Sequence, residues 1–268
     1  MSPDQPPSRG FNLPLSLPRR MVCDLLHFSH RVPTVPVQRV IDVSRLVELR
    51  KETGAHVGWV TLFTIAFARV AAEMPELRRA YLPYPQPRLY QHPFSVASVA
   101  VEREYAGEKG VFYGRIPKPE SLELLELDAA LRRFKTAPVE EAYHFLFRFY
   151  RLPRPLRRLI WWYVINLRGS RKAEFMGTFA VTVYSALGAE SLHPLSPLTA
   201  TLNYGVIGPD GRVPVRVVYD HRVMDGATIA RALARLDEVL NGEVADELTE
   251  IGRSGHVRSD SLREPGAV

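Results

Sequence analysis

The sequence predicts an α/β fold: a two-layer sandwich in which helices cover a mostly antiparallel or mixed sheet. Two observations indicate it. Runs of β-branched residues with strand-like patterning are interspersed with amphipathic helical runs. Two pairs of strand runs are also joined by short turn-like segments, which predicts hairpins. Strands and helices distributed in this way are typical of a sheet covered by helices.

The first strand and the first two helices are expected early in the chain. Residues 36–40 alternate like a strand, and the spacing then turns helical as far as residue 52, with Asp42 or Ser44 available as the N-cap. Residues 59–77 are apolar on most of the helix circumference as far as Pro75. This predicts a buried helix.

The middle of the chain predicts a hairpin and three helices. Two strand runs flank the turn-like segment AGEKG, and amphipathic runs follow, the first with acidic residues in its early turns. The strands are expected over residues 94–104 and 110–116, and the helices over 120–138, 139–152 and 155–167.

The last third predicts another strand, a hairpin and a helix. Residues 177–188, GTFAVTVYSALG, indicate a strand with small residues at its exit. Residues 198–208 and 213–220 flank the turn PDGR. An alanine-rich helical run begins after residue 226.

Composition bounds the class of protein. The 268 residues carry a formal net charge of +6. Most of the positive charge lies on arginine, whose guanidinium group suits phosphate and carboxylate groups. Nucleic acid is an unlikely partner because no recognition motif is present. The single cysteine, Cys23, excludes a disulfide framework and a cysteine metal site, and a cytoplasmic location fits. No histidine spacing indicates a metal, and no apolar run is long enough to cross a membrane.

We expect one domain between two flexible ends. The start is rich in proline and lacks the pattern of a secretory signal. The predicted division is a flexible arm over residues 1–19, a catalytic domain over 20–245 and a flexible tail over 246–268.

The segment YDHRVMDGA places His221 between the last strand run and the last helical run, four residues before Asp225. One interpretation is structural: a histidine satisfied by backbone, Asp225 as an N-cap and Gly226 easing the turn. The other is functional, because strand-to-helix junctions commonly present reactive groups and Asp225 is near enough to orient its surroundings.

This segment resembles the catalytic domain of the acyltransferase component of 2-oxoacid dehydrogenase complexes, which is related in fold to chloramphenicol acetyltransferase. The segments IDVSRLVELRKE, LFTIAFARVAAEMPELRRAY, GTFAVTVYSALG and LSPLTATLNYGVI match that domain's landmarks in order. Peptide-synthetase condensation domains share the His-x-x-x-Asp-Gly pattern. Asp220 before the histidine favours the dehydrogenase-type relatives.

The resemblance implies CoA-dependent acyl transfer with His221 as general base, a role suited to an imidazole near neutral pH. It implies a hydroxyl that stabilises the oxyanion at Thr182, or at Ser185 if the register slips. It further implies that Asp225 pairs with an N-terminal arginine, Arg20 or else Arg19, that Gly226 permits a tight turn, and that the active site lies between the subunits of a homotrimer. No residues are assigned to the CoA phosphates.

Two features depart from the resemblance. The sequence holds no Asp-Lys-Ala hairpin that could carry lipoate, so we expect a stand-alone catalytic domain and, if it serves a dehydrogenase complex, a lipoyl-bearing chain in trans. A non-catalytic trimeric scaffold or interaction protein is the alternative.

Residues 147–175 are longer and more basic and aromatic than the corresponding connection in those relatives. Three interpretations stay open: a helical cover with solvated arginines, a membrane-surface element, or a lid over an apolar acyl chain. The membrane interpretation rests on aromatic residues flanked by arginines, namely Trp161, Trp162, Tyr163, Arg157, Arg158 and Arg168. His193 is interpreted as a loop histidine or as a contact to CoA or the acyl group.

Overall fold

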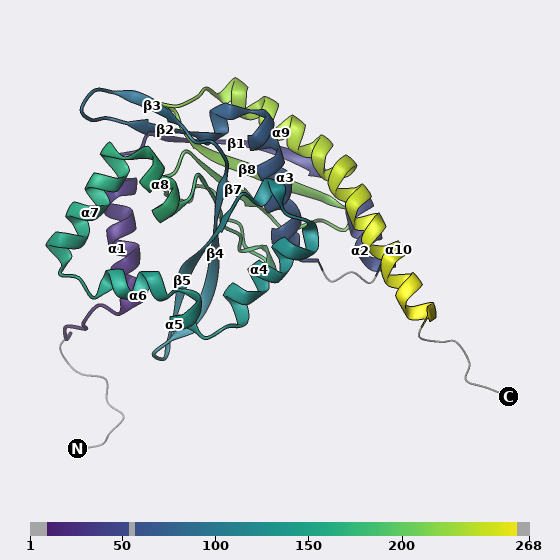
Figure 1. Cartoon of the computed structure of the whole chain (residues 1–268), viewed down its shortest axis with the longest axis horizontal. Helices are drawn as coiled ribbons and strands as arrows, with labels where there is room; N and C mark the ends of the chain where they lie inside the picture. Colours follow the sequence, from purple (N-terminus) through teal and green to yellow (C-terminus); the bar gives the residue numbers. More distant parts are fainter. Residues whose placement is uncertain (1–9, 54–56, 262–268) are drawn as a thin grey trace, which may run out of the picture.

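The computed structural model describes residues 10–53 and 57–261 and is built around a six-stranded sheet (Figure 1). Its strands are β1 (Thr34–Asp42), β4 (Val96–Tyr105), β5 (Glu108–Pro117), β6 (Phe179–Val181), β7 (Ala200–Tyr204) and β8 (Arg212–Asp220). They lie in the order β1-β8-β7-β6-β4-β5. β6 runs parallel to both of its neighbours, and the other pairs are antiparallel. The predicted mixed α/β fold and both predicted hairpins are confirmed.

One face of the sheet is covered by apolar helices. These are α2 (Ser44–Glu52), α3 (Trp59–Glu73), α4 (Leu124–Thr136), α9 (Gly226–Val239) and α10 (Ala245–Ser261), with a π-helical turn (Leu240–Val244) between the last two. α3 buries ten of its fifteen residues, as the sequence predicted. Phe63 stacks on Tyr204 with ring centroids 4.2 Å apart, and Phe67 packs on Phe179 at 4.9 Å. The apolar side chains of alternate strand positions meet these helices and form the main core.

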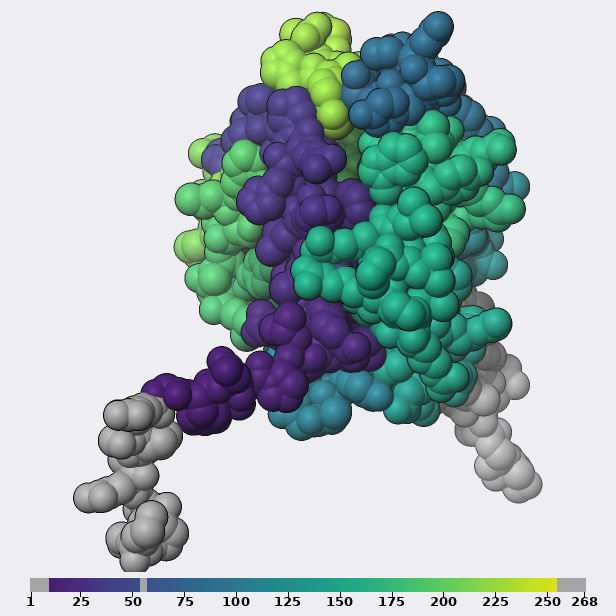
Figure 2. Space-filling view, turned by 90° about the vertical axis from the view of Figure 1, so that its left-hand side faces the viewer, coloured from purple at the N-terminus to yellow at the C-terminus, as the bar shows by residue number. Residues whose placement is uncertain are grey.

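The opposite face carries a second group of helices. They are α1 (Leu17–Ser29), α6 (His144–Tyr150), α7 (Arg154–Leu167) and α8 (Gly169–Met176), with α5 (Val139–Ala142) just before them. Figure 2 looks onto this cover, where the purple N-terminal segment runs between the teal helices and the green loop that follows β6. The short hairpin of β2 (Arg79–Leu82) and β3 (Arg88–Gln91) forms a separate two-stranded sheet.

Helices extend into both of the segments that the sequence predicted to be flexible. α1 begins at Leu17, inside the arm expected over residues 1–19, because Ser16 caps it by accepting the Arg19 N–H and Pro18 sits in the first turn, where proline is tolerated. α10 occupies much of the tail expected over 246–268, because Leu248 is fully buried against the core. Residues 1–9 and 262–268 lie outside the described residues.

One smaller expectation concerns the N-cap of α2. Val43, not Asp42 or Ser44, is the N-cap of α2, although the Asp42 carboxylate accepts the Ser44 N–H at 2.9 Å. Within the described ranges, no helix is both long and apolar enough to span a bilayer.

Candidate active site

His221 lies on the turn that follows β8, where a scaffold of buried groups fixes the backbone. Its own N–H donates to the Pro33 carbonyl at 3.1 Å, just before β1. Its side chain is 48% exposed, and Nδ1 is 3.8 Å from Oδ1 of Asp225, which begins α9. The imidazole is therefore held close to a carboxylate while one side remains open to an incoming group.

The adjoining Asp220 organises this turn. It is 2% exposed and accepts both prongs of the Arg222 guanidinium, at 2.9 Å from Nε and 2.7 Å from Nη2. The Arg222 backbone N–H also donates to Asp220 at 3.0 Å. Arg222 then stacks over Tyr81, 4.4 Å from the ring centroid. Such a bidentate pair is a rigid support, and it fixes the residues on both sides of His221.

Lys172 of α8 lies behind the same turn. It is 3% exposed, and burial lowers the pKa of its ammonium group to about 8, although the negative charge of Asp220 acts in the opposite direction. The sequence alone did not single out Arg222 or Lys172, because their roles come from contacts between distant elements.

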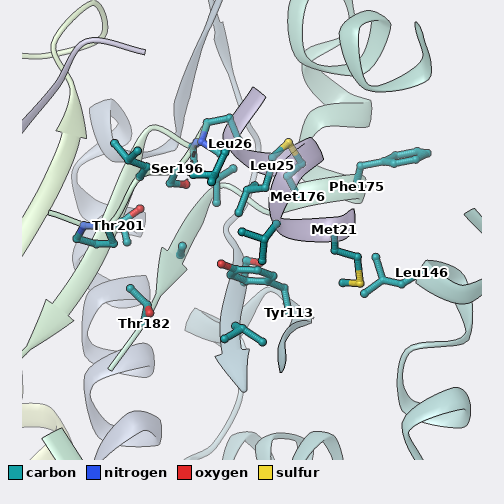
Figure 3. A pocket seen from close by; sticks show the side chains of 18 of the residues that line it. Met21, Leu25, Leu26, Tyr113, Leu146, Phe175, Met176, Thr182, Ser196 and Thr201 are labelled. Atoms are coloured by element: carbon teal, nitrogen blue, oxygen red, sulfur yellow. Dashed lines mark hydrogen bonds between the residues drawn. The ribbon is translucent and has the colours of Figure 1, made fainter. Parts of the chain in front are cut away.

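Thr182 lies at the end of β6, on the sheet face opposite α3. Its N–H continues the parallel ladder to the Leu202 carbonyl at 3.1 Å, and it is 7% exposed. It lines a cavity of about 330 Å³ together with Thr201 and Tyr113 (Figure 3). Burial raises the pKa of Tyr113 to about 12, so its phenol stays protonated at neutral pH. Ser185, the alternative, lies in a 3₁₀ turn (Ser185–Leu187) and lines a different pocket.

A single chain does not bring His221 and Thr182 together. Phe179, Ala200 and Tyr219 occupy one row of the sheet. His221 lies two residues beyond Tyr219, on one side of that row. Thr182 lies three residues beyond Phe179, on the opposite side of the row, and its strand β6 is two strands away from β8. Strand geometry thus separates them by about 19 Å. A site that uses both residues needs two copies of the chain.

Asp225 pairs with His221 in this structure, and the predicted partner Arg20 lies on a different element. Arg20 lies in the first turn of α1, and Arg19 beside it pairs with Glu108 at 3.3 Å. Beside His221, Nη1 of Arg222 instead donates to the backbone carbonyl of Arg31, which follows the C-terminal end of α1, at 3.5 Å. The side chain of Asp225 is 84% exposed and faces His221.

Gly226, predicted to permit a tight turn, does so without a left-handed backbone. Gly226 is the first residue of α9 and is not among the glycines with positive φ. A methyl group added there would meet the Tyr219 hydroxyl at 3.4 Å, an ordinary contact. No feature of the turn therefore requires glycine at this position.

His193 ties the loop after β6 to the start of β1. Its Nε2 lies 2.7 Å from the Thr34 hydroxyl, and Thr34 is the register partner of Asp220. The histidine thus has a structural contact on the same edge of the sheet as His221. Among the residues that the structure places, no cluster of three or more potential ligands could hold a metal ion.

The fold is similar to known acyltransferase structures. No protein-family model matches the chain, and no curated protein is similar in sequence. The cubic core of a pyruvate dehydrogenase multienzyme complex superposes with a TM-score of 0.66 at 20% identity, covering 91% of this chain and 99% of that one. Chloramphenicol acetyltransferase gives 0.52 at 16% identity, over 81% and 94%.

The dihydrolipoamide acetyltransferase of Azotobacter vinelandii gives a TM-score of 0.64 at 21% identity, over 91% of this chain and 99% of that one. A serine, a histidine and an asparagine have been investigated in the catalytic mechanism of that enzyme. These likenesses confirm the predicted chloramphenicol acetyltransferase-like fold.

Proposed function

We propose that the protein is a CoA-dependent acyltransferase whose active site forms between copies of the chain, with His221 of one copy facing Thr182 of the next. The observation that carries the proposal is a half-exposed imidazole, fixed by the buried Asp220–Arg222 pair, on a chain with an acyltransferase fold. The separation of the two side chains within one chain supports an assembly in which neighbours complete the site, and a trimer is the form expected.

The reaction follows from these groups. The His221 imidazole takes the proton of the acceptor, which attacks the thioester carbonyl of an acyl-CoA. Negative charge develops on the carbonyl oxygen, where the Thr182 hydroxyl donates a hydrogen bond. The intermediate collapses by breaking the carbon–sulfur bond, and the CoA thiolate leaves with the proton held by the imidazole. The acceptor receives the acyl group, and no oxidant or reductant is needed.

Mixed-subunit complementation tests the proposal. His221→Ala is expected to lower acyl transfer by about 10²–10⁴-fold and Thr182→Val by about 10²–10³-fold, since one removes the base and the other the oxyanion donor. Unfolding the two variants together and refolding them lets hybrids form. About a quarter of the interfaces in a randomly mixed ring then join an intact histidine to an intact threonine. Activity should return to that share of wild type.

Matched controls make this result specific. Ser185→Ala changes a nearby hydroxyl outside the cavity and should transfer acyl groups like wild type. Circular dichroism and size-exclusion chromatography check that each variant folds and assembles. Full activity of His221→Ala would refute the proposal, and recovery absent from the mixture would refute the shared site. A wild-type trimer that turns over no acyl-CoA would favour the scaffold alternative.

A further inference from the structure

The cavity beside Thr182 lies between the second group of helices, the sheet and the loop after β6. α1, α6, α7 and α8 supply eleven of its 25 lining residues, and the strands and that loop supply the others. The apolar side chains that line it include Met21, Leu25, Leu146, Phe149, Trp161 and Phe175. Four of the lining residues, Phe149, Tyr150, Trp161 and Phe175, come from residues 147–175, the segment that departs from the resemblance. The cover therefore encloses a space rather than only shielding the sheet.

The two ends of the cavity differ in chemistry. Figure 3 shows Thr182, Thr201 and Ser196 toward one side and Met21 and Leu146 toward the other. Thr201 is 2% exposed, and its hydroxyl has no hydrogen-bond partner among the described residues. A buried hydroxyl without a partner costs free energy, so a ligand oxygen at this end would satisfy it. The opposite end offers methyl, thioether and aromatic groups.

The cavity has no free charge to bind an anion. Among its lining residues Arg115 is the charged one, and its guanidinium already donates to the carbonyls of Glu174 and Phe175 and lies over the Phe145 ring. Arg157 of the same cover is 4% exposed and paired with Asp24, outside the lining. The cavity suits an uncharged apolar chain that ends in an oxygen acceptor.

We propose that this cavity holds the hydrocarbon chain of a medium- or long-chain acyl donor, with the thioester carbonyl at the Thr182 and Thr201 end. The inference rests on the proposed acyltransferase function and names its substrate class. The cover helices then limit the length of the acyl chain that fits into the cavity. Because the charged CoA moiety finds no counter-charge inside, it stays outside the cavity while the chain enters.

Chain-length dependence of the wild-type protein is the first test. The kcat/KM for acetyl-, butyryl-, octanoyl- and palmitoyl-CoA is measured with one acceptor, by release of free thiol. Each methylene that enters the cavity should raise kcat/KM by about fourfold until the chain reaches the far wall. Equal or better use of acetyl-CoA than of octanoyl-CoA would overturn the inference.

Blocking variants locate the effect in the cavity. Leu25→Trp fills the middle and Leu146→Trp the far end, so each should lower the octanoyl-to-acetyl ratio of kcat/KM at least tenfold or shift the optimum to shorter chains. Leu159→Trp is the matched control, because Leu159 lies on the outer surface of α7 and is 61% exposed. Thermal unfolding identifies any variant that fails to fold. The second blocking position keeps the test valid if one of the two variants does not fold. An unchanged ratio in both folded variants would contradict the proposal.

A binding measurement separates this inference from the proposed function. Calorimetry with His221→Ala measures the affinity for octanoyl-CoA, acetyl-CoA and octanoate without turnover. Tighter binding of octanoyl-CoA than of acetyl-CoA, lost in the Leu25→Trp background, supports the chain site even if no transfer occurs. Octanoate should bind more weakly, because its carboxylate meets no free cation. Acetyl transfer without any chain-length preference would support the function and refute the chain site.

Discussion

The two covers of the central sheet are held in place by different forces. On the α3 side, alternate positions of β7 and β8 are Ala200, Leu202, Val215 and Val217, all completely buried against apolar helices. On the other side, the intervening positions of the same strands include Thr201, Asn203 and Arg216. One face is an apolar core, and the other is polar and cavity-forming. Burying a threonine hydroxyl in a strand costs stability, and on this face the buried threonines lie where the proposed chemistry needs space.

The cover of the second face is fixed by a buried ion pair. Asp24 of α1 is 1% exposed and accepts Nε and Nη2 of Arg157 of α7, at 3.1 and 3.0 Å. Arg157 also lies over Tyr150, with 4.6 Å between Cζ and the ring centroid. This position corrects the expectation of solvated arginines, at least for Arg157. A salt bridge between two helices sets their register, whereas apolar packing alone allows them to shift.

The membrane-surface interpretation loses part of its basis in this cover. Trp161 lines the cavity and stacks on Phe28, and Trp162 packs on Tyr84. The apolar residues that α7 leaves exposed are Leu156, Leu159 and Tyr163. Of the three aromatic residues that suggested a headgroup boundary, Trp161 and Trp162 therefore pack within the protein, and Tyr163 stays exposed.

Removing one partner of the buried pair should have the largest effect on stability. Asp24→Leu leaves the Arg157 guanidinium buried and unpaired, which is expected to cost about 3–5 kcal/mol. Glu108→Gln, at the exposed pair with Arg19, should cost less than about 1 kcal/mol. Urea unfolding measures both. The double variant Asp24→Leu/Arg157→Leu should recover much of the loss, and equal losses for the buried and exposed pairs would remove the contrast between the covers.

The apolar face could be predicted from the sequence and the second cover could not. The alternation in residues 213–220 and the mostly apolar run at 59–73 lie in continuous segments, so the strand β8 and the helix α3 follow from periodicity. The β2–β3 hairpin has only four residues in each strand, too few for a pattern. α1 begins inside a proline-rich stretch that indicated an extended arm.

For the candidate site, too, some features could be predicted from the sequence and others could not. The position of His221 follows from a strand-to-helix junction, and Thr182 from a motif that resembles known acyltransferases. Asp225 and Arg20 lie at separate ends of the fold, and only three-dimensional structure shows this. The cavity could not be located from the sequence, because its walls come from elements far apart in the chain. The alternation of Thr199, Thr201 and Asn203 was the one local signal of a polar strand face.

Acid should destabilise the fold through His92, the residue that follows β3. Burial lowers the pKa of His92 to about 4 from 6.5, and the positive charges of Lys172 and Arg78 act in the same direction. The unfolded chain therefore takes up a proton before the folded one does. Stability present above pH 6.5 is lost as the pH falls toward about 4. The slope from this one proton is at most about 1.4 kcal/mol per pH unit.

Comparing wild type with His92→Phe isolates this proton. The variant keeps a ring that can pack on Tyr90, whose centroid lies 5.0 Å from that of His92. Urea unfolding of both proteins between pH 4 and pH 7 should show the variant losing less stability on acidification. Parallel curves for the two proteins would place the acid-sensitive group elsewhere.

The smallest expected effect lies at the first residue of α9, next to the turn that carries His221. Gly226 has no left-handed backbone, and a methyl group would touch the Tyr219 hydroxyl at 3.4 Å without overlap. Gly226→Ala should therefore raise the free energy of unfolding by less than about 1 kcal/mol, because alanine restricts the unfolded chain. Thermal unfolding and acyl transfer are measured together. A large loss of stability would mean that the turn carrying His221 needs glycine after all, and that this turn is as constrained as the buried face beneath it.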